Sequence, residues 1–358
     1  MKNIYRYLII ILFAGAILFP HEYIFAGNKD RSGQAGASEL LINPWARSTG
    51  WGSVNTAAVH GLEALYANVA GTAFTLGTEV NFSYTNWLKG SDVNIMAFGV
   101  SQKLGESGGV LSLAIMNMNF GEVEITTTNL PEGGIGTFKP NYLNINLAYA
   151  KAFSNSIYGG MNIKIISESI ADASAQGIAL DAGIQYVTGE KENIKFGVAL
   201  KNVGPEMKFK GDGLSFRGVI PGHGNDNDKF TVSQRAQTYE LPATLRIGAA
   251  YDFLIGDLNR ITVAGNFTSN SFTKDQISLG LEYGLKHYLM LRAGYTYQKG
   301  IFKSAVEDRG TVFTGLSAGF TVSVPFDKEK ETGMAIDYSY NATNPYAGCH
   351  AVGIKLNF

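Results

Sequence analysis

The sequence predicts an all-β protein: a transmembrane antiparallel β-barrel of about 14 strands with an N-terminal segment that plugs its lumen. Three observations support this. Apolar and polar side chains alternate with a period of two over long stretches, charged residues make up only 16% of the chain, and the last strand ends on Phe358. Alternation places the apolar side chains on one face of each strand. In a closed membrane barrel that face meets lipid.

The composition excludes several other classes of protein. The chain is rich in Gly (43), Tyr (18) and Phe (21), as expected for long strands with an aromatic belt. A net charge of -1 gives no basic footprint for a nucleic acid, so no nucleic-acid partner is expected. The single Cys349 excludes an internal disulfide and a Cys-based zinc site.

The N-terminus has the pattern of a secretory signal peptide. Lys2 and Arg6 precede an apolar run at residues 7–18, and Ala26 is a suitable cleavage residue. A membrane anchor is the alternative, but the run is shorter than the roughly 20 residues that a spanning helix needs. We divide the chain into signal peptide, leader and plug segment, and barrel, at residues 1–26, 27–77 and 78–358.

The plug segment is rich in small residues and is expected to form short helices and turns, either inside the barrel or under its mouth. The barrel strands are expected near residues 78–88, 92–103, 109–120, 140–153, 156–169, 175–188, 193–203, 241–253, 259–269, 276–286, 288–299, 312–324, 333–341 and 348–358. The last strand should pair with the first and close the barrel. Two strands, near 92–103 and 109–120, alternate poorly, which leaves the count open by two.

A soluble β-sandwich would also alternate, but two patterns go against it. The expected strands exceed the roughly 5–6 residues common in sandwiches. Every second gap between strands is also short. The gaps between these include three long ones, at residues 121–139, 204–240 and 300–311. Outer-membrane barrels have short periplasmic turns and long outer loops. The sequence therefore predicts an outer-membrane protein in which an even strand count places both ends of the chain on the periplasmic side.

The polar faces of the strands should line the lumen with charges of both signs. Charges of both signs favour a paired network that holds the plug in place. They go against a selective pore, which usually has rings of charge of one sign. A barrel of this size is wide enough either to need a plug or to leak. The predicted lumen and plug contacts are Lys164, Lys195, Arg246, Glu282, Arg292 and Asp337.

No catalytic constellation is present. The sequence lacks the motifs of zinc proteases, phosphate-binding loops and serine hydrolases. The polar run at residues 223–228 lacks the spacing of a calcium-binding EF-hand. We therefore expect no enzymatic activity, no cofactor and no metal site.

The long loop at residues 204–240 mixes apolar and basic side chains in its first half. Exposed apolar side chains on an outer loop usually mark a partner surface or a lid. A loop that folds over its own barrel mouth is an equal alternative. The predicted partner-binding residues, on this loop and on other outer loops, are Phe209, Leu214, Phe216, Arg217, Val219, Ile220, Phe302 and Tyr346.

Four stretches carry a resemblance to a known family. Residues 46–52 read ARSTGWG, a small-residue stretch that precedes EALYANVAG at residues 63–71. Residues 200–209 read LKNVGPEMKF, and residues 241–252 read LPATLRIGAAYD. They resemble the ALYWNPAG signature and the NxGPxxKF and LPxxLRIGaAYD patterns of the PorV/PorQ-like proteins, and more distantly the FadL superfamily. Ala67 and Val69 replace the Trp and Pro of the first signature.

Membership would imply a FadL-like barrel with a non-enzymatic role in type IX protein secretion. The family's extracellular loops bind C-terminal β-domains of secreted cargo and shuttle them from a large translocon barrel to attachment-complex proteins. The implied partners are these proteins and outer-membrane lipids. The alternative is a FadL-like transporter of hydrophobic small molecules, which the plug-like N-terminus favours. A plain diffusion porin is a weaker third interpretation.

Overall fold

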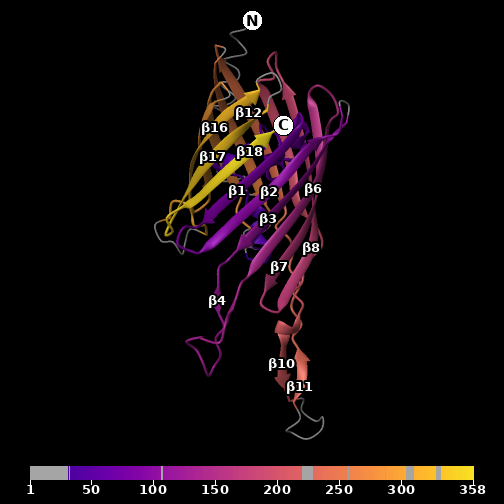
Figure 1. Ribbon diagram of the computed structural model, residues 1–358, viewed down its shortest axis with the longest axis vertical. Helices are drawn as coiled ribbons and strands as arrows, with labels where there is room; N and C mark the ends of the chain where they lie inside the picture. The colour runs from indigo at the N-terminus through magenta and orange to yellow at the C-terminus, as the bar shows by residue number, and fades with distance from the viewer. Residues whose placement is uncertain are drawn as a thin grey trace.

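The chain forms a closed antiparallel barrel, shown in Figure 1. The computed structural model describes residues 31, 33–105, 108–219, 229–256, 258–286, 288–303, 310–327 and 332–358. The predicted signal peptide, with its cleavage near Ala26, lies outside these residues. Within them, no helix has the length and hydrophobicity required to cross a bilayer.

The predicted barrel of 14 strands is confirmed, in the order β1-β18-β17-β16-β15-β14-β13-β12-β9-β8-β7-β6-β3-β2. The strands are β1 (Thr78–Trp87), β2 (Val93–Lys103), β3 (Val110–Asn119), β6 (Asn141–Ala152), β7 (Ile157–Ile170), β8 (Ala173–Thr188), β9 (Ile194–Val203), β12 (Thr244–Ile255), β13 (Asn259–Asn270), β14 (Gln276–Leu285), β15 (Leu289–Gln298), β16 (Phe313–Asp327), β17 (Thr332–Thr343) and β18 (Cys349–Asn357). The terminal strand pairs with β1, from Glu79↔Asn357 to Asn86↔His350, as predicted.

One strand begins later than its pattern suggested. The alternation started at Leu241, but β12 begins at Thr244. Pro242 has no amide hydrogen to donate to a sheet ladder. Leu241 is instead buried in a cluster that includes Leu40 of the N-terminal segment.

The two faces of the barrel differ in polarity. On β14, Ile277 and Leu279 point outward and are exposed, whereas Ser278 and Glu282 point into the lumen and are buried. The apolar exterior is the surface that a membrane barrel presents to lipid. Strands β2 and β3 alternated poorly because residues on their lumen faces, such as Met116, are also apolar and pack against the plug.

The two ends of the barrel carry different loops. Turns are short at the end where Thr78 and Phe358 meet. The other end carries two hairpins, β4 (Val123–Glu124) with β5 (Thr137–Phe138), and β10 (Ser215–Gly218) with β11 (Phe230–Ser233), preceded by the short helix η5 (Asp212–Leu214). Figure 1 shows them projecting well beyond the barrel. Because bacterial barrels have short periplasmic turns, the hairpins mark the outer end.

Residues 38–77 fill the lumen, and we call this segment the plug. Its helical parts are η2 (Ser38–Leu41), α2 (Ala46–Thr49), η3 (Leu62–Tyr66) and η4 (Val69–Phe74). Leu62, Leu65 and Tyr66 pack against lumen-facing residues of β2, β3 and β6. The chain enters at the outer end, where the Gly36 amide donates to the Glu240 carbonyl at 3.1 Å, and leaves at the periplasmic end to start β1.

Candidate functional site

Buried hydrogen bonds fix the centre of the plug to the wall. The Asn68 side-chain amide donates to the Thr56 carbonyl at 2.9 Å and to the Ile184 carbonyl of β8 at 3.0 Å. The Lys201 ammonium of β9 donates to the Tyr66 carbonyl at 2.6 Å. The stretch at residues 63–71 singled out in the sequence is therefore a structural anchor. Its partners on β8 and β9 were not predicted.

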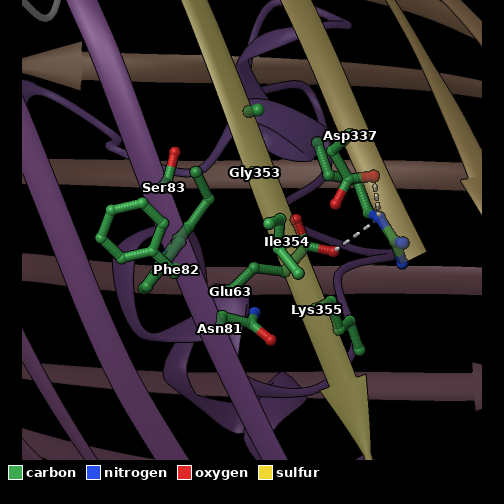
Figure 2. Close-up of a pocket in the computed structure, with 11 residues that line it drawn as sticks. Glu63, Asn81, Phe82, Ser83, Asp337, Gly353, Ile354 and Lys355 are labelled. Carbon is green, nitrogen blue, oxygen red and sulfur yellow. Dashed lines mark hydrogen bonds and ion pairs between the residues drawn. The ribbon is translucent and has the colours of Figure 1, made fainter. Parts of the chain in front are cut away.

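A charged latch joins the plug to the seam where the barrel closes. Arg47 of α2 lies 3.1 Å from Asp337 of β17 and 3.9 Å from Glu63 of η3. In Figure 2 one dashed line runs from Glu63 and another from Asp337, and they mark these two ion pairs. Close by, Ser83 of β1 donates to the Pro44 carbonyl at 2.7 Å. Plug and wall are thus held together at the seam.

A small cavity of about 190 Å³ lies on the periplasmic side of the plug. Its lining includes Arg47, Lys195, Arg260, Glu63, Glu282, Arg292 and Lys355. Each cation there has a carboxylate partner. Besides the Arg47 latch, the pairs are Lys195–Asp252 at 2.8 Å, Arg260–Glu282 at 2.5 Å, Arg292–Glu282 at 2.6 Å and Lys355–Glu79 at 2.9 Å. This side is a neutral, paired network that holds structure together.

A larger cavity of about 550 Å³ lies on the outer side of the plug, and we call it the outer cavity. Its apolar lining includes Ile42, Trp87, Met118, Phe120, Tyr142, Ile301, Phe313 and Leu316. Its polar lining includes Asn43, Arg246, Thr268, Asn270, Gln276, Thr296, Gln298 and Asn341. The size lies within the roughly 300–1,000 Å³ of small-molecule sites.

The aromatic and the polar residues that line the outer cavity lie on opposite arcs of the barrel. The aromatic side chains come from β1, β16, β6 and the end of β3, with Trp87 and Phe313 edge-to-face at 5.6 Å and Phe120 and Tyr142 at 4.8 Å. Most of the polar side chains come from β12 to β15, across the lumen in the strand order. Such a chamber suits a molecule with an apolar body and a polar end.

Two ionisable groups of the outer cavity lack the partners found on the periplasmic side. Nε and Nη1 of Arg246 hydrogen-bond to no described residue, and neither do the carboxylate oxygens of Glu39. Burial, with the nearby Glu168 carboxylate, raises the pKa of Glu39 to about 8. The Tyr239 hydroxyl donates to Glu168.

The outer cavity reaches the barrel wall at an irregular seam between β15 and β16. Ladder pairing between these strands ends at Tyr295↔Leu316, although β15 continues to Gln298. Gly315 has φ +91°, a conformation that suits glycine, and a register shift against β17 lies at the same place. Leu316 faces outward, 59% exposed, yet it also lines the cavity. The cavity therefore approaches the lipid-facing surface here.

The structure places all six predicted lumen residues inside the barrel. Asp337 pairs with the plug through Arg47, and Arg246 lines the outer cavity. The remaining four are paired within the wall: Lys164 with Asp181 at 2.8 Å, Lys195 with Asp252, and Arg292 with Glu282. A role in binding a ligand or fixing the plug stays a prediction for each.

The predicted partner-binding residues are dispersed. Phe216, Arg217 and Val219 are exposed on or beside the β10–β11 hairpin, after a half-buried Leu214. Phe209 instead packs against Tyr239 of its own loop, with ring centroids 5.9 Å apart. Ile220 lies outside the described residues. Phe302 and Tyr346 are exposed on two other outer loops, with Phe302 beside Tyr295 and Tyr297 at the β15–β16 seam.

Within the described residues, no group of three or more His, Cys, Asp and Glu side chains could hold a metal ion. Apart from Arg246, the residues that line the outer cavity were missed by sequence reasoning. Trp87, Phe120 and Phe313 stand at strand ends, where the period of two gives no clear face. Their shared position becomes visible only once the barrel is closed.

Comparisons with known proteins identify the fold. No protein-family model and no curated protein matches the sequence. Among solved structures, a TodX monoaromatic hydrocarbon channel with a ΔS2S3 deletion aligns with 87% of this chain and 98% of its own, at 12% identity and a TM-score of 0.55. The Ralstonia pickettii toluene transporter TbuX aligns with 88% of this chain and 98% of its own, at 11% identity and a TM-score of 0.51.

These likenesses and the closed barrel confirm the expected fold class, an antiparallel β-barrel of 14 strands with an N-terminal segment ahead of the barrel. At identities of 11–12% they establish the fold alone. A place among the PorV/PorQ-like proteins is finer than this and stays a proposal.

Proposed function

We propose that this protein binds hydrophobic small molecules in the outer cavity and carries them from the cell exterior into the barrel. The observation that carries the proposal is the cavity itself, about 550 Å³, with aromatic side chains along one arc. Apolar molecules leave water for such a lining because burial of apolar surface is favourable, by roughly 25 cal/mol per Å². The hydrocarbon channels that share the fold support this choice over the secretion role.

The β15–β16 seam offers a route out of the cavity. The plug is tied to the wall on its periplasmic side, so straight passage requires the Arg47 latch to open. Passage beside Leu316 requires only local movement of a stretch where ladder pairing has already ended. A molecule leaving there would enter the outer leaflet without exposing its apolar surface to water.

Filling the cavity should block the activity. Asn341 lines it, is half-buried and carries no side-chain hydrogen bond among those described, so Asn341→Trp adds bulk at little structural cost. Leu279→Trp is the matched control, because Leu279 faces lipid on β14. Cells that make the wild-type protein should take up radiolabelled toluene faster than empty-vector cells. Asn341→Trp should reduce uptake to the vector level, and Leu279→Trp should not.

Wild-type uptake equal to the vector would refute the proposal. So would unchanged uptake in Asn341→Trp, provided that this variant still shows the gel mobility shift on heating that marks a folded barrel.

The second candidate function is capture of the C-terminal β-domains of secreted cargo in type IX secretion. The observation that favours it is the β10–β11 hairpin, which projects beyond the barrel with Phe216 and Val219 exposed (Figure 1). Exposed apolar side chains at a loop tip are common at protein-binding surfaces.

A short deletion tests the second candidate cleanly. Residues 212–233 are replaced by a Gly-Ser linker, which leaves the backbone pairs Ser174↔Lys210 and Met207↔Tyr239 in place. Loss of cargo β-domain capture from solubilised outer membranes would support the shuttle role. Capture that survives this deletion contradicts it. Deleting the β4–β5 hairpin controls for the loss of any outer loop.

A further inference from the structure

We propose that the outer cavity binds an organic ammonium ion between a pair of buried carboxylates and a pair of aromatic rings. The inference rests on the proposed function, because it names the class of molecule that the cavity takes. Glu39 lies on η2 of the plug and lines the cavity, and Glu168 lies on β7 of the wall. Tyr142 lies on β6 directly opposite Glu168 and lines the cavity too.

The two carboxylates have no cation. Glu39 is 2% exposed and Glu168 is 3% exposed, and in the described part of the chain neither forms an ion pair. Both carboxylate oxygens of Glu39 also have no hydrogen-bond partner among these residues. Buried carboxylates are tolerated when they are paired and are costly when they are not. A bound cation would supply the missing donor.

A proton is the other way to neutralise this pair. Burial and the nearby Glu168 carboxylate raise the pKa of Glu39 to about 8, so Glu39 is mostly protonated at pH 7. Burial and the hydrogen bond to Glu168 raise the pKa of Tyr239, which stays a neutral donor. Arg246 lines the cavity from β12 and forms no ion pair with either carboxylate among the described residues. An ammonium ion that binds Glu39 would therefore displace its proton to the buffer.

The aromatic rings indicate a cation independently of the carboxylates. Phe120 and Tyr142 pack edge-to-face with ring centroids 4.8 Å apart, and both line the cavity. The face of an aromatic ring attracts an ammonium ion, most strongly where water is excluded. Because Tyr142 lies opposite Glu168 in the sheet, the rings and the carboxylates meet at one part of the wall.

The arrangement defines the ligand as an ammonium group on an apolar body. Trp87 and Phe313, which pack edge-to-face at 5.6 Å, line the same cavity and would contact that body. A metal ion is a poorer match, because no group of three or more His, Cys, Asp and Glu side chains gathers in the described residues.

Calorimetry on the full purified protein tests the inference with two matched probes, 4-phenylbutylamine and the neutral 4-phenylbutan-1-ol. We expect the ammonium form of the amine to bind roughly tenfold more tightly, because charge-assisted hydrogen bonds are the stronger ones. At pH 7 its binding should release close to one proton, seen as a heat that depends on the ionisation enthalpy of the buffer. Its affinity should rise about tenfold between pH 7 and pH 9, as Glu39 loses its proton.

Two matched variants separate the carboxylate from the rest of the cavity. Glu39→Gln should remove both the preference for the amine and the proton release, and it should leave binding of the alcohol unchanged. Glu122→Gln alters an exposed carboxylate at the same end of the barrel and should change none of these quantities.

The inference and the proposed function fail in different ways. Equal binding of the two probes to the wild-type protein, or a preference for the amine that survives Glu39→Gln in a heat-modifiable barrel, would overturn the ammonium site and leave the apolar chamber intact. Tighter amine binding without proton release at pH 7 would also overturn it. Absence of binding by both probes would overturn the chamber as well.

Discussion

The two sides of the plug use lumen charge in opposite ways. On the periplasmic side the cavity is about 190 Å³ and its cations are paired with carboxylates, beginning with Arg47 and Asp337. On the outer side the cavity is about 550 Å³, and Arg246 and Glu39 carry unpartnered atoms. Paired charge fixes one segment of chain against another. Charge left unpaired beside an apolar cavity is available to a ligand. The two sides therefore differ more in whether their charged residues have ion-pair partners than in how many charged residues they contain.

The largest effect should come from breaking the latch. Arg47→Met leaves Asp337 and Glu63 buried without their cation, which typically costs about 3–5 kcal/mol. We expect earlier unfolding in urea and, if the plug leaves the lumen, higher conductance in planar bilayers. The control is Lys139→Met, which breaks an exposed pair with Glu122 and should lower stability far less, because exposed ion pairs contribute little. Equal losses in the two variants would contradict the latch.

A slightly smaller effect should follow from loosening the plug core. Leu62 is 0% exposed between the plug and the wall, so Leu62→Ala should cost about 2–5 kcal/mol. Leu279 is 60% exposed on the lipid-facing surface, and Leu279→Ala leaves no cavity in the protein. Thermal unfolding in detergent should separate the two clearly. Equal unfolding temperatures for the two variants would contradict a role for Leu62 in the core between plug and wall.

On the outer side, pH should act through Glu39. Its pKa in the folded protein is raised from 4.5 to about 8, so the folded state favours the protonated carboxyl. The stabilisation is complete below about pH 4.5 and is lost as pH rises through 8. Hydrogen exchange of residues 36–41, corrected for intrinsic rates, should be faster at pH 9 than at pH 6. Glu39→Gln should remove this pH dependence. If the pH dependence persists in this variant, another ionisable group causes it.

The smallest effect on stability should come from filling the outer cavity. Asn341→Trp enters open space and should change the free energy of unfolding by less than about 1 kcal/mol. Thr262→Trp is its counterpart on the paired side, where Thr262 is buried and donates to Asp252 at 2.6 Å. Overpacking there should cost about 1–3 kcal/mol or more. Similar urea midpoints for the two variants would contradict the proposal that the outer cavity has more free space than the periplasmic side.

Local pattern was enough to predict the barrel but not its contents. The period of two predicted the strands and the β1–β18 closure, because it depends only on neighbouring residues. It was less clear for β2, whose lumen face packs on the plug. Inward-facing charges were also predictable, but their partners were not. Arg47 and Asp337 are 290 residues apart in the chain, and the closing seam brings them together.

The long outer loop at residues 204–240 also shows what the sequence pattern alone could not predict. Exposed Phe216 and half-buried Phe209 look alike in the sequence, since both are aromatic residues in one basic, apolar stretch. Phe209 packs on Tyr239 because the loop base forms a backbone pair at Met207↔Tyr239. Phe216 lies beyond that pair, on the hairpin. The base of the loop thus packs on itself, and partner binding stays a prediction for the exposed hairpin.

The most direct test is a crystal structure of the protein soaked with 4-bromotoluene, a neutral probe whose bromine can be located by anomalous scattering. We expect a bromine peak inside the barrel, on the outer side of the plug, among Trp87, Phe120 and Phe313. Bromine peaks confined to the lipid-facing exterior, with none in the outer cavity at saturating probe, would contradict it.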